Sequence, residues 1–124
     1  MKPIHSDNAP KAIGPYSPAV KAGNVVFFSG QVPLDPKTMA LVSTDFREQV
    51  VQVFRNLATV CEAAGGKLSD LCKITIYLID LGNFAIVNEV METFFQPPYP
   101  ARTTIQVSAL PKNAKIEIDA FMIQ

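Results

Sequence analysis

The chain has 124 residues, which is one domain's worth and enough to bury a single core. Its 11 basic and 11 acidic residues cancel without forming a run of either sign, so the basic stripe that phosphate binding needs is absent and nucleic acid is disfavoured as a partner. No apolar run approaches the roughly 18 residues of a membrane span, and the first residues do not form a signal peptide, so we expect a cytoplasmic protein.

Two further features of the composition bear on assembly and redox state. Charged residues make up 18% of the chain, below the roughly 25% of an average globular protein. A low charge content with many apolar residues suggests that part of the surface is buried against another subunit. Cys61 and Cys72 both fall in apolar patterns and are expected to be reduced thiols in the core.

The first part of the chain is predicted to be extended. Three prolines and a glycine between Pro10 and Pro18 exclude a helix and favour a turning segment over residues 1–18. The next residues read as strand, turn and strand, with the turn at 22–24. The apolar run at 25–29 is typical of a strand covered on both faces, and Gly30 is expected to help end it.

The clearest helix covers residues 45–64. Its apolar side chains recur at i, i+3, i+4 and i+7, which places them on one stripe. Asp45 and Glu48 fit a capping pair at its start, and Gly65 with Gly66 fits the stop at its end.

A second amphipathic helix is predicted over residues 83–95. Asp80 is expected to cap it, and the prolines after residue 96 prevent its continuation. Its inward-facing side chains are expected to be Phe84, Val87, Met91, Phe94 and Phe95.

Three further strands complete the predicted elements. Residues 71–79 are rich in β-branched and aromatic side chains. In the strand that follows the prolines, an apolar row alternates with the polar row Arg102, Thr104, Gln106 and Ser108. In the last strand, Ile116, Ile118, Ala120 and Met122 alternate with Lys115, Glu117 and Asp119.

The order of elements is therefore β-β-α-β-α-β-β, which predicts an α/β (α+β) fold with a sheet and two helices on one of its faces. We treat residues 1–124 as a single domain. The uncovered face is expected to carry Arg102, Thr104, Gln106, Glu117 and Asp119 together with Tyr77, Phe121 and Ile123. A sheet face that mixes charges with large apolar groups is often an oligomer interface, and small-molecule sites occur in the clefts of such interfaces.

Arg102 and Glu117 are the two residues best suited to chemistry. The guanidinium of Arg102 can bind a carboxylate through two hydrogen bonds. Glu117 lies between two isoleucines and can act as a general base or hold a water molecule. The alternatives are a surface or subunit salt bridge for Arg102 and a solvated strand residue for Glu117.

The remaining candidates are less specific. Tyr16 lies between prolines and either closes over a ligand or anchors the N-terminal segment. Ser29 and Gly30 end a buried strand, where a glycine allows close approach of a ligand or simply makes a turn. One histidine, His5, and two separated cysteines form no metal-binding pattern, and no nucleotide-binding glycine motif occurs.

Five segments, read together, resemble one family. They are AIGPYSPAV, FFSGQVP, NLATVCEAAG, FAIVNEVMETFF and PARTTIQVSALPKNAKIEIDA, in that order. The chain resembles the YjgF/RidA (L-PSP) family of reactive-intermediate deaminases over nearly its whole length. The PAR motif, followed about a dozen residues later by IEI, is the most specific part of the match.

The resemblance implies a chorismate-mutase-like fold, a mixed sheet in which the last two strands are not neighbours, and a homotrimer with ligand clefts between subunits. It implies hydrolysis of enamines and imines such as 2-aminoacrylate and 2-aminocrotonate to 2-keto acids and ammonium, without a cofactor. Arg102 would bind the substrate carboxylate and Glu117 would activate the attacking water. Tyr16, Ser29 and Gly30 would shape the pocket, with support from Asn88 of the second helix.

One residue departs from the resemblance. Many relatives carry a cysteine where this chain has Thr104, so any thiol-dependent behaviour of relatives is not expected here, although a threonine still offers a hydrogen bond. Two alternatives to a deaminase remain: a non-catalytic module that binds 2-keto acids in the same cleft, and the ribonuclease or translation-inhibitor activity attached to some relatives. The balanced charge disfavours the second.

Overall fold

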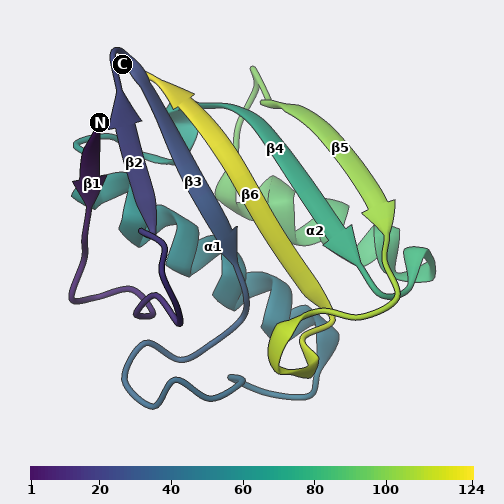
Figure 1. Cartoon of the computed structure of the whole chain (residues 1–124). Helices are drawn as coiled ribbons and strands as arrows, with labels where there is room; N and C mark the ends of the chain where they lie inside the picture. Colours follow the sequence, from purple (N-terminus) through teal and green to yellow (C-terminus); the bar gives the residue numbers. More distant parts are fainter.

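The computed structural model describes all of residues 1–124 and contains one six-stranded sheet with two helices on one of its faces (Figure 1). The strands are β1 (Lys2–Ile4), β2 (Ala19–Ala22), β3 (Val25–Gln31), β4 (Leu71–Leu78), β5 (Ala101–Gln106) and β6 (Ile116–Ile123). The helices are α1 (Phe46–Ala63) and α2 (Phe84–Phe94), with short 3-10 turns η1 (Leu68–Asp70), η2 (Leu81–Asn83) and η3 (Pro111–Asn113). The predicted α+β architecture is confirmed.

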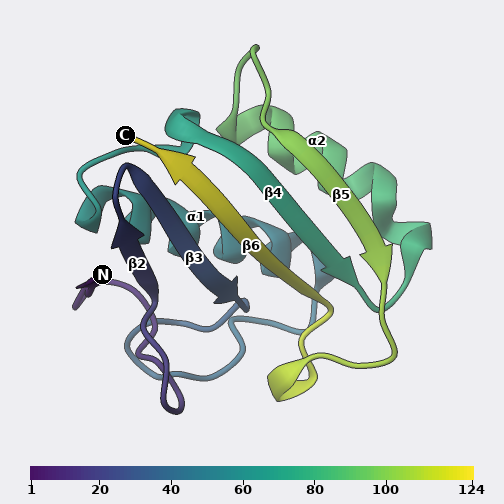
Figure 2. The same ribbon diagram turned by 45° about the horizontal axis from the view of Figure 1, so that its top comes forward.

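The strands lie in the order β1-β2-β3-β6-β4-β5. All neighbouring pairs are antiparallel except β4 and β5, which are parallel, so the sheet is mixed. The chain from β5 to β6 passes around the end of β4 (Figure 2), and β4 therefore separates the last two strands. This separation agrees with the expectation drawn from the resemblance.

Helix α1 is fixed by local sequence at both ends. At its start the Asp45 side chain accepts a hydrogen bond from the Glu48 amide at 3.0 Å, which satisfies one of the amides that a helix start leaves free. At its end the amides of Gly65 and Gly66 donate to the carbonyls of Glu62 and Cys61. Both predicted signals are confirmed. Asp80 instead caps the 3-10 turn before α2, accepting from the Gly82 amide at 2.8 Å.

The core lies between the helices and the sheet. Phe54 of α1 is fully buried and packs against Phe94 and Phe95, with ring centroids 5.4 and 5.6 Å away. Truncation of a buried phenylalanine to alanine costs about 3–5 kcal/mol, so this contact between α1 and the end of α2 is central to stability.

Neither helix combines the length and the apolar character that a membrane crossing needs.

Three features of individual segments differ from the predictions. The N-terminal segment is extended as predicted, but it also contains a short strand, β1, which pairs antiparallel with β2 through contacts that local sequence does not encode. Within the chain, strand β3 is covered on one face only, since Phe27 is 41% exposed on the other. Cys61 is buried as expected, but Cys72 is exposed because it lies at an irregularity in the pairing of β4 with β6.

The orientation of β5 also differs from the prediction. Arg102 lies opposite Ile74 of β4, and Thr104 lies opposite Ile76. Both isoleucines are fully buried toward the helices, and residues paired across strands share a face, so Arg102, Thr104 and Gln106 point toward α2. The row Thr103 and Ile105 takes the open face instead.

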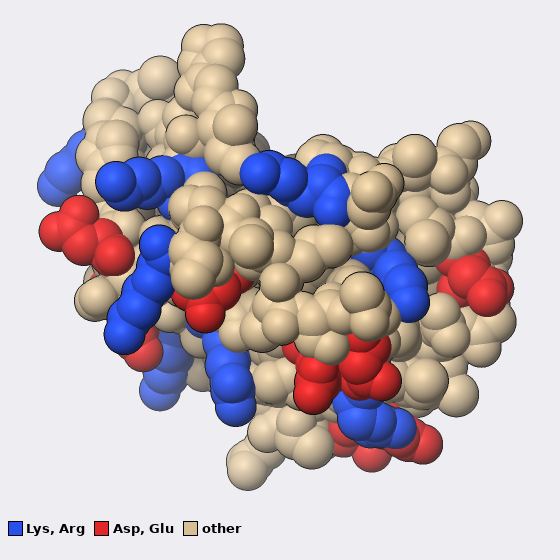
Figure 3. Space-filling model, turned by 90° about the horizontal axis from the view of Figure 1, so that it is seen from below, with Lys and Arg blue, Asp and Glu red and all other residues tan.

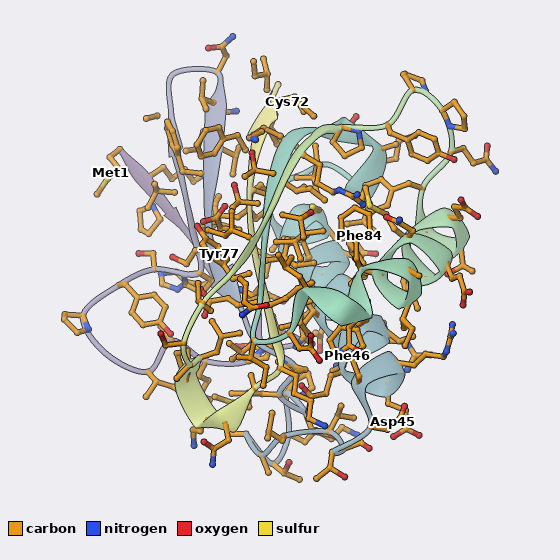
Figure 4. All side chains as sticks on the ribbon, turned by 90° about the vertical axis from the view of Figure 1, so that its right-hand side faces the viewer. Met1, Asp45, Phe46, Cys72, Tyr77 and Phe84 are labelled. Atoms are coloured by element: carbon orange, nitrogen blue, oxygen red, sulfur yellow. The ribbon has the colours of Figure 1, made fainter.

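Glu117 and Asp119 do lie on the open face, as predicted. Glu117 pairs with Tyr77, and Asp119 accepts a hydrogen bond from the Tyr77 hydroxyl at 2.8 Å. Viewed from the β5 edge, Phe84 of α2 lies on the side of the sheet that carries the helices, and Tyr77 lies toward the other side (Figure 4).

Candidate active site

Arg102 stands at the start of the edge strand β5 and reaches helix α2. One of its terminal nitrogens, Nη1, donates to the side-chain oxygen of Asn88 at 2.7 Å and lies 3.6 Å from the sulfur of Met91. Its Cζ atom lies 4.9 Å from the centroid of the Phe84 ring. We call Arg102 and these three neighbours the guanidinium half-site. All its contacts are neutral, and the chain's one ion pair, Arg47 with Glu89, does not involve Arg102.

A cavity of about 280 Å³ adjoins the guanidinium half-site. Its lining residues are Asn88, Met91, Glu92, Tyr99, Pro100 and Arg102. The cavity is open to solvent, and its wall combines the Arg102 cation and the Glu92 carboxylate with the apolar surfaces of Met91 and Pro100. Such a wall suits a small organic molecule whose negative end meets Arg102.

Thr104 lies two residues after Arg102 on the same face of β5. Its hydroxyl oxygen is buried and has no hydrogen-bond partner. Buried hydroxyl groups are nearly always paired with protein, water or ligand. The Thr104 hydroxyl is therefore available to a bound molecule or a water on the helix side of β5.

Glu117 belongs to a second cluster, on the open face. Its carboxylate lies across Gly30 of β3, so close that a Cβ atom at Gly30 would be 2.7 Å from Glu117 Cδ and would overlap the carboxylate itself. The irregular pairing of β3 with β6 between Phe28 and Gln31 brings Gly30 to this position. We call Glu117, Gly30, Ser29 and Tyr16 the carboxylate half-site.

The pKa of Glu117 is raised above its usual value. Burial is the larger cause, because it penalises the charged form, and the negative charge of Asp119 adds to it. A hydrogen bond to Asp119 is the main cause that raises the pKa of Tyr77 to about 12. Glu117 is thus a carboxyl group that holds its proton more tightly than usual, and it forms no ion pair within the chain.

The proline-rich segment before β2 is tied to the end of β3 beside Gly30. The Ser29 hydroxyl donates to the carbonyl of Ser17 at 2.6 Å, and the Ser29 amide donates to the carbonyl of Pro18. The Tyr16 hydroxyl accepts from the amide of Ile13 at 3.0 Å. Tyr16 and Gly30 line one small cavity of about 30 Å³, which is room for a single water molecule.

The two half-sites do not meet within one chain. Arg102 is on the helix side of β5 and Glu117 is on the open side of β6, with β4 between the two strands. The expectation that both side chains share one polar face is therefore wrong. The structure brings Arg102 together with Asn88, and it brings Glu117 together with Gly30.

The sequence patterns missed several residues that contact these groups. Phe84 and Met91 were expected in the core; Met91 is buried there and also contacts Arg102, whereas Phe84 is 40% exposed and contacts Arg102 through its ring. Their spacing from Asn88 is the available signal, because positions 84, 88 and 91 share one stripe of a helix. Tyr99 stood among loop prolines and carried no pattern that indicates a cavity wall.

In chemical terms, one half-site offers a fixed cation and the other offers a carboxyl group with a raised pKa. No cluster of three or more His, Cys, Asp or Glu is arranged to hold a metal ion. The fold and these residues define an α+β domain that presents a cation and a carboxyl group in two separate clusters, on opposite faces of one sheet.

Comparison with known proteins then gives the family. The family model described as Endoribonuclease L-PSP matches residues 6–124. A RutC family protein of Pyrococcus horikoshii is 50% identical over 94% of this chain and 93% of its own length. A protein of Dermatophagoides farinae named 2-iminobutanoate/2-iminopropanoate deaminase is 44% identical over 97% and 94%. The chain belongs to the endoribonuclease L-PSP family, also called YjgF/RidA.

Solved structures agree with this placement. The crystal structure of RidA from an Antarctic Psychrobacter superposes with a TM-score of 0.97 at 47% identity and covers 100% of both chains. The structure of TdcF from E. coli with bound serine gives a TM-score of 0.95 at 39% identity and covers 100% of this chain and 99% of that one.

Proposed function

We propose that this protein hydrolyses reactive enamines and imines of 2-amino acids, such as 2-aminoacrylate and 2-aminocrotonate, to 2-keto acids and ammonium. The site is a cleft between neighbouring subunits of a homotrimer, with the guanidinium half-site of one subunit facing the carboxylate half-site of the next. The observation that carries the proposal is the position of Arg102 and Glu117 on opposite faces of one sheet, neither of them in an ion pair within its own chain.

The open face of the sheet supports such an assembly. Phe27 and Phe121 form an edge-to-face pair with centroids 5.4 Å apart, and both are more than two-fifths exposed. Ile123 is 56% exposed beside them. Large apolar side chains grouped on one face are typical of a subunit interface.

Arg102 binds the substrate carboxylate in this scheme. Asn88 occupies Nη1, which leaves the edge formed by Nε and Nη2 for two parallel hydrogen bonds to a carboxylate. A relative whose structure contains bound serine supports a small amino-acid-like ligand for this family, and the name of the Dermatophagoides relative supports the reaction.

Glu117 carries the proton transfers. A proton from solvent first adds to C3 of the enamine, which becomes the iminium. Glu117 then takes a proton from a water molecule while the water oxygen bonds to the iminium carbon and the C=N electron pair moves to nitrogen. Glu117 returns that proton to nitrogen, the C–N bond breaks, and the hydroxyl proton passes to the departing ammonia as the C=O bond forms, so ammonium leaves. A raised pKa suits a group that accepts and returns one proton.

The rest of the carboxylate half-site keeps this geometry. Gly30 allows the Glu117 carboxylate to lie against the backbone of β3. Ser29 fixes the proline-rich segment that carries Tyr16, so Tyr16 closes the water-sized cavity beside Gly30. The imine carbon is already electrophilic, and orientation with a placed water supplies most of the remaining barrier reduction. The scheme includes no cofactor.

Two other functions compete with this proposal. A module that only binds 2-keto acids would need Arg102 but would not need Glu117 as a base. A ribonuclease would need a surface that attracts phosphate, whereas the face seen from below carries both charge signs interspersed (Figure 3) and the chain has no net charge.

The test is a coupled assay. A threonine dehydratase generates 2-aminocrotonate, and formation of 2-ketobutyrate is followed with and without this protein. We expect the wild type to accelerate the reaction and Arg102→Ala to lose that acceleration while the oligomer persists by light scattering. The remote exposed Arg55→Ala is the matched control and should behave as wild type.

Acceleration that Arg102→Ala retains would remove the carboxylate clamp from the proposal. Binding of 2-ketobutyrate by the wild type without acceleration would favour the binding module. Salt-dependent binding of RNA by the wild type would favour the nuclease.

A further inference from the structure

Arg102 is held entirely by one helix. Phe84, Asn88 and Met91 lie on one stripe of α2, and they contact the guanidinium through a ring face, an amide oxygen and a thioether sulfur. None of these groups carries a charge. The guanidinium plane is therefore oriented without being neutralised, and its positive charge remains available to a ligand.

Phe84 has an unusual place in this arrangement. It is the first residue of an amphipathic helix, yet its side chain is 40% exposed. Its ring covers one face of the guanidinium, with the Cζ atom 4.9 Å from the centroid. An aromatic ring at this distance attracts a cation and excludes water from the covered face.

The backbone around Phe84 is tied to the strand that carries Arg102. The amide of Leu81 donates to the side chain of Gln106 at 3.0 Å, and Gln106 is four residues after Arg102 on the same face of β5. Asp80 caps the same turn through the amide of Gly82. The start of α2 is thus fixed against β5 at one point and through Arg102 at a second.

From these contacts we infer that Phe84 is a positioning residue for the carboxylate clamp. Its ring holds the guanidinium plane so that Nη1 meets Asn88 and the edge of Nε and Nη2 faces the cleft. This inference rests on the proposed function for the identity of the ligand, but the contact itself is testable without activity. Phe84 does not touch the reacting atoms, so its loss should weaken binding more than turnover.

The experiment compares Phe84→Leu, which keeps an apolar side chain without a π face, with Phe84→Tyr and Phe84→Trp, which keep the π face. We expect Phe84→Leu to raise KM for 2-aminocrotonate and Kd for 2-ketobutyrate by about three- to tenfold, with kcat within about twofold of wild type. Phe84→Tyr and Phe84→Trp should restore both constants. Phe94→Leu is the matched control on the same helix, because Phe94 packs against Phe54 and not against Arg102.

A second readout separates this inference from the proposed function. In the wild type, the ring current of Phe84 should shift the Arg102 side-chain NH signals upfield in NMR spectra, and Phe84→Leu should remove that shift. Absence of the shift, or unchanged KM and Kd in Phe84→Leu, would overturn the positioning role. A wild type that shows the shift but neither binds nor converts the substrate would support the contact and reject the proposed reaction.

Discussion

The carboxylate of Glu117 occupies the space that a Cβ atom at Gly30 would fill. Glu117 comes from β6 and Gly30 from the irregular end of β3, so the contact depends on sheet pairing and not on local sequence. It fixes the position of a carboxyl group whose pKa is raised. The absence of a side chain at residue 30 is therefore part of the site.

Gly30→Ala should separate activity from stability. The added methyl group must displace the Glu117 carboxylate, which is the flexible end of a long side chain, so the free energy of unfolding should change by less than about 1 kcal/mol. Displacement of the base should lower kcat by about tenfold or more. Chemical denaturation and the coupled assay measure the two effects.

Gly23→Ala should have the opposite effect: it should lower stability and leave activity unchanged. Gly23 has a φ of 61° and nothing within 4 Å of the added Cβ atom, so alanine there costs about 1 kcal/mol through backbone strain alone. Its kcat should equal that of wild type. Equal activity in Gly30→Ala and Gly23→Ala would contradict the role of the Glu117 position.

The pH dependence of the reaction should move with the charge of Asp119. Burial is the larger cause of the raised pKa of Glu117, and the negative charge of Asp119 adds to it. Asp119 itself accepts a hydrogen bond from the Tyr77 hydroxyl. Glu117 acts as a base only when ionised, so kcat/KM should fall as pH falls through its pKa. Asp119→Asn lowers that pKa and should shift the acid limb of kcat/KM to lower pH.

Glu62→Gln is the control for this shift, because Glu62 is exposed near the end of α1 and belongs to neither half-site. An acid limb that stays in place in Asp119→Asn, or that moves to higher pH, would mean that another group carries the proton. The profile should be measured with saturating dehydratase at every pH.

Glu117→Gln should raise stability while it lowers activity. The pKa of Glu117 is higher in the folded chain than in the unfolded chain, so the folded state binds the proton more tightly. Stability from this group is present at low pH and is lost as pH rises through the folded pKa. Above that pH a neutral glutamine removes the penalty, so Tm should rise at pH 8 and not at pH 4. A lower Tm at pH 8 would contradict the burial argument.

A substitution at Thr104 should likewise have different effects on stability and on ligand binding. Its buried hydroxyl has no partner within the chain, and valine of the same shape removes an unpaired polar group at a gain of up to about 1 kcal/mol. We expect Thr104→Val to keep or raise Tm and to weaken 2-ketobutyrate binding, measured by calorimetry, whereas Thr104→Ser keeps the hydroxyl and the affinity. Unchanged affinity in Thr104→Val would exclude a ligand contact by the hydroxyl.

The elements whose signals are local could be predicted from the sequence. Helix α1 follows from its apolar stripe, its Asp45 cap and the glycines after it, all within one segment. Strand β1 could not be predicted, because three residues beside β2 carry no pattern of their own.

The composition of the site was easier to predict than its arrangement. On the edge strand β5, one row is polar and the other mixes Thr103 with apolar side chains, so alternation gives the two rows but not the face that each row takes. The register with β4 decides it: Arg102 opposite Ile74 turns the polar row toward α2. Phe84 was missed for a related reason, since an aromatic residue on a helical stripe usually indicates core and here contacts a cation.

The central claim is that Arg102 of one subunit and Glu117 of the next complete one site, and mixed oligomers test it directly. Arg102→Ala and Glu117→Gln subunits are unfolded together in equal amounts and refolded, with each variant alone as control. In a closed ring of heterologous contacts, random mixing gives about a quarter of the clefts both a wild-type Arg102 and a wild-type Glu117. The account predicts about a quarter of wild-type activity in the mixture and almost none in either variant alone. Mixed oligomers that form, as mass spectrometry would show, but remain inactive would contradict it.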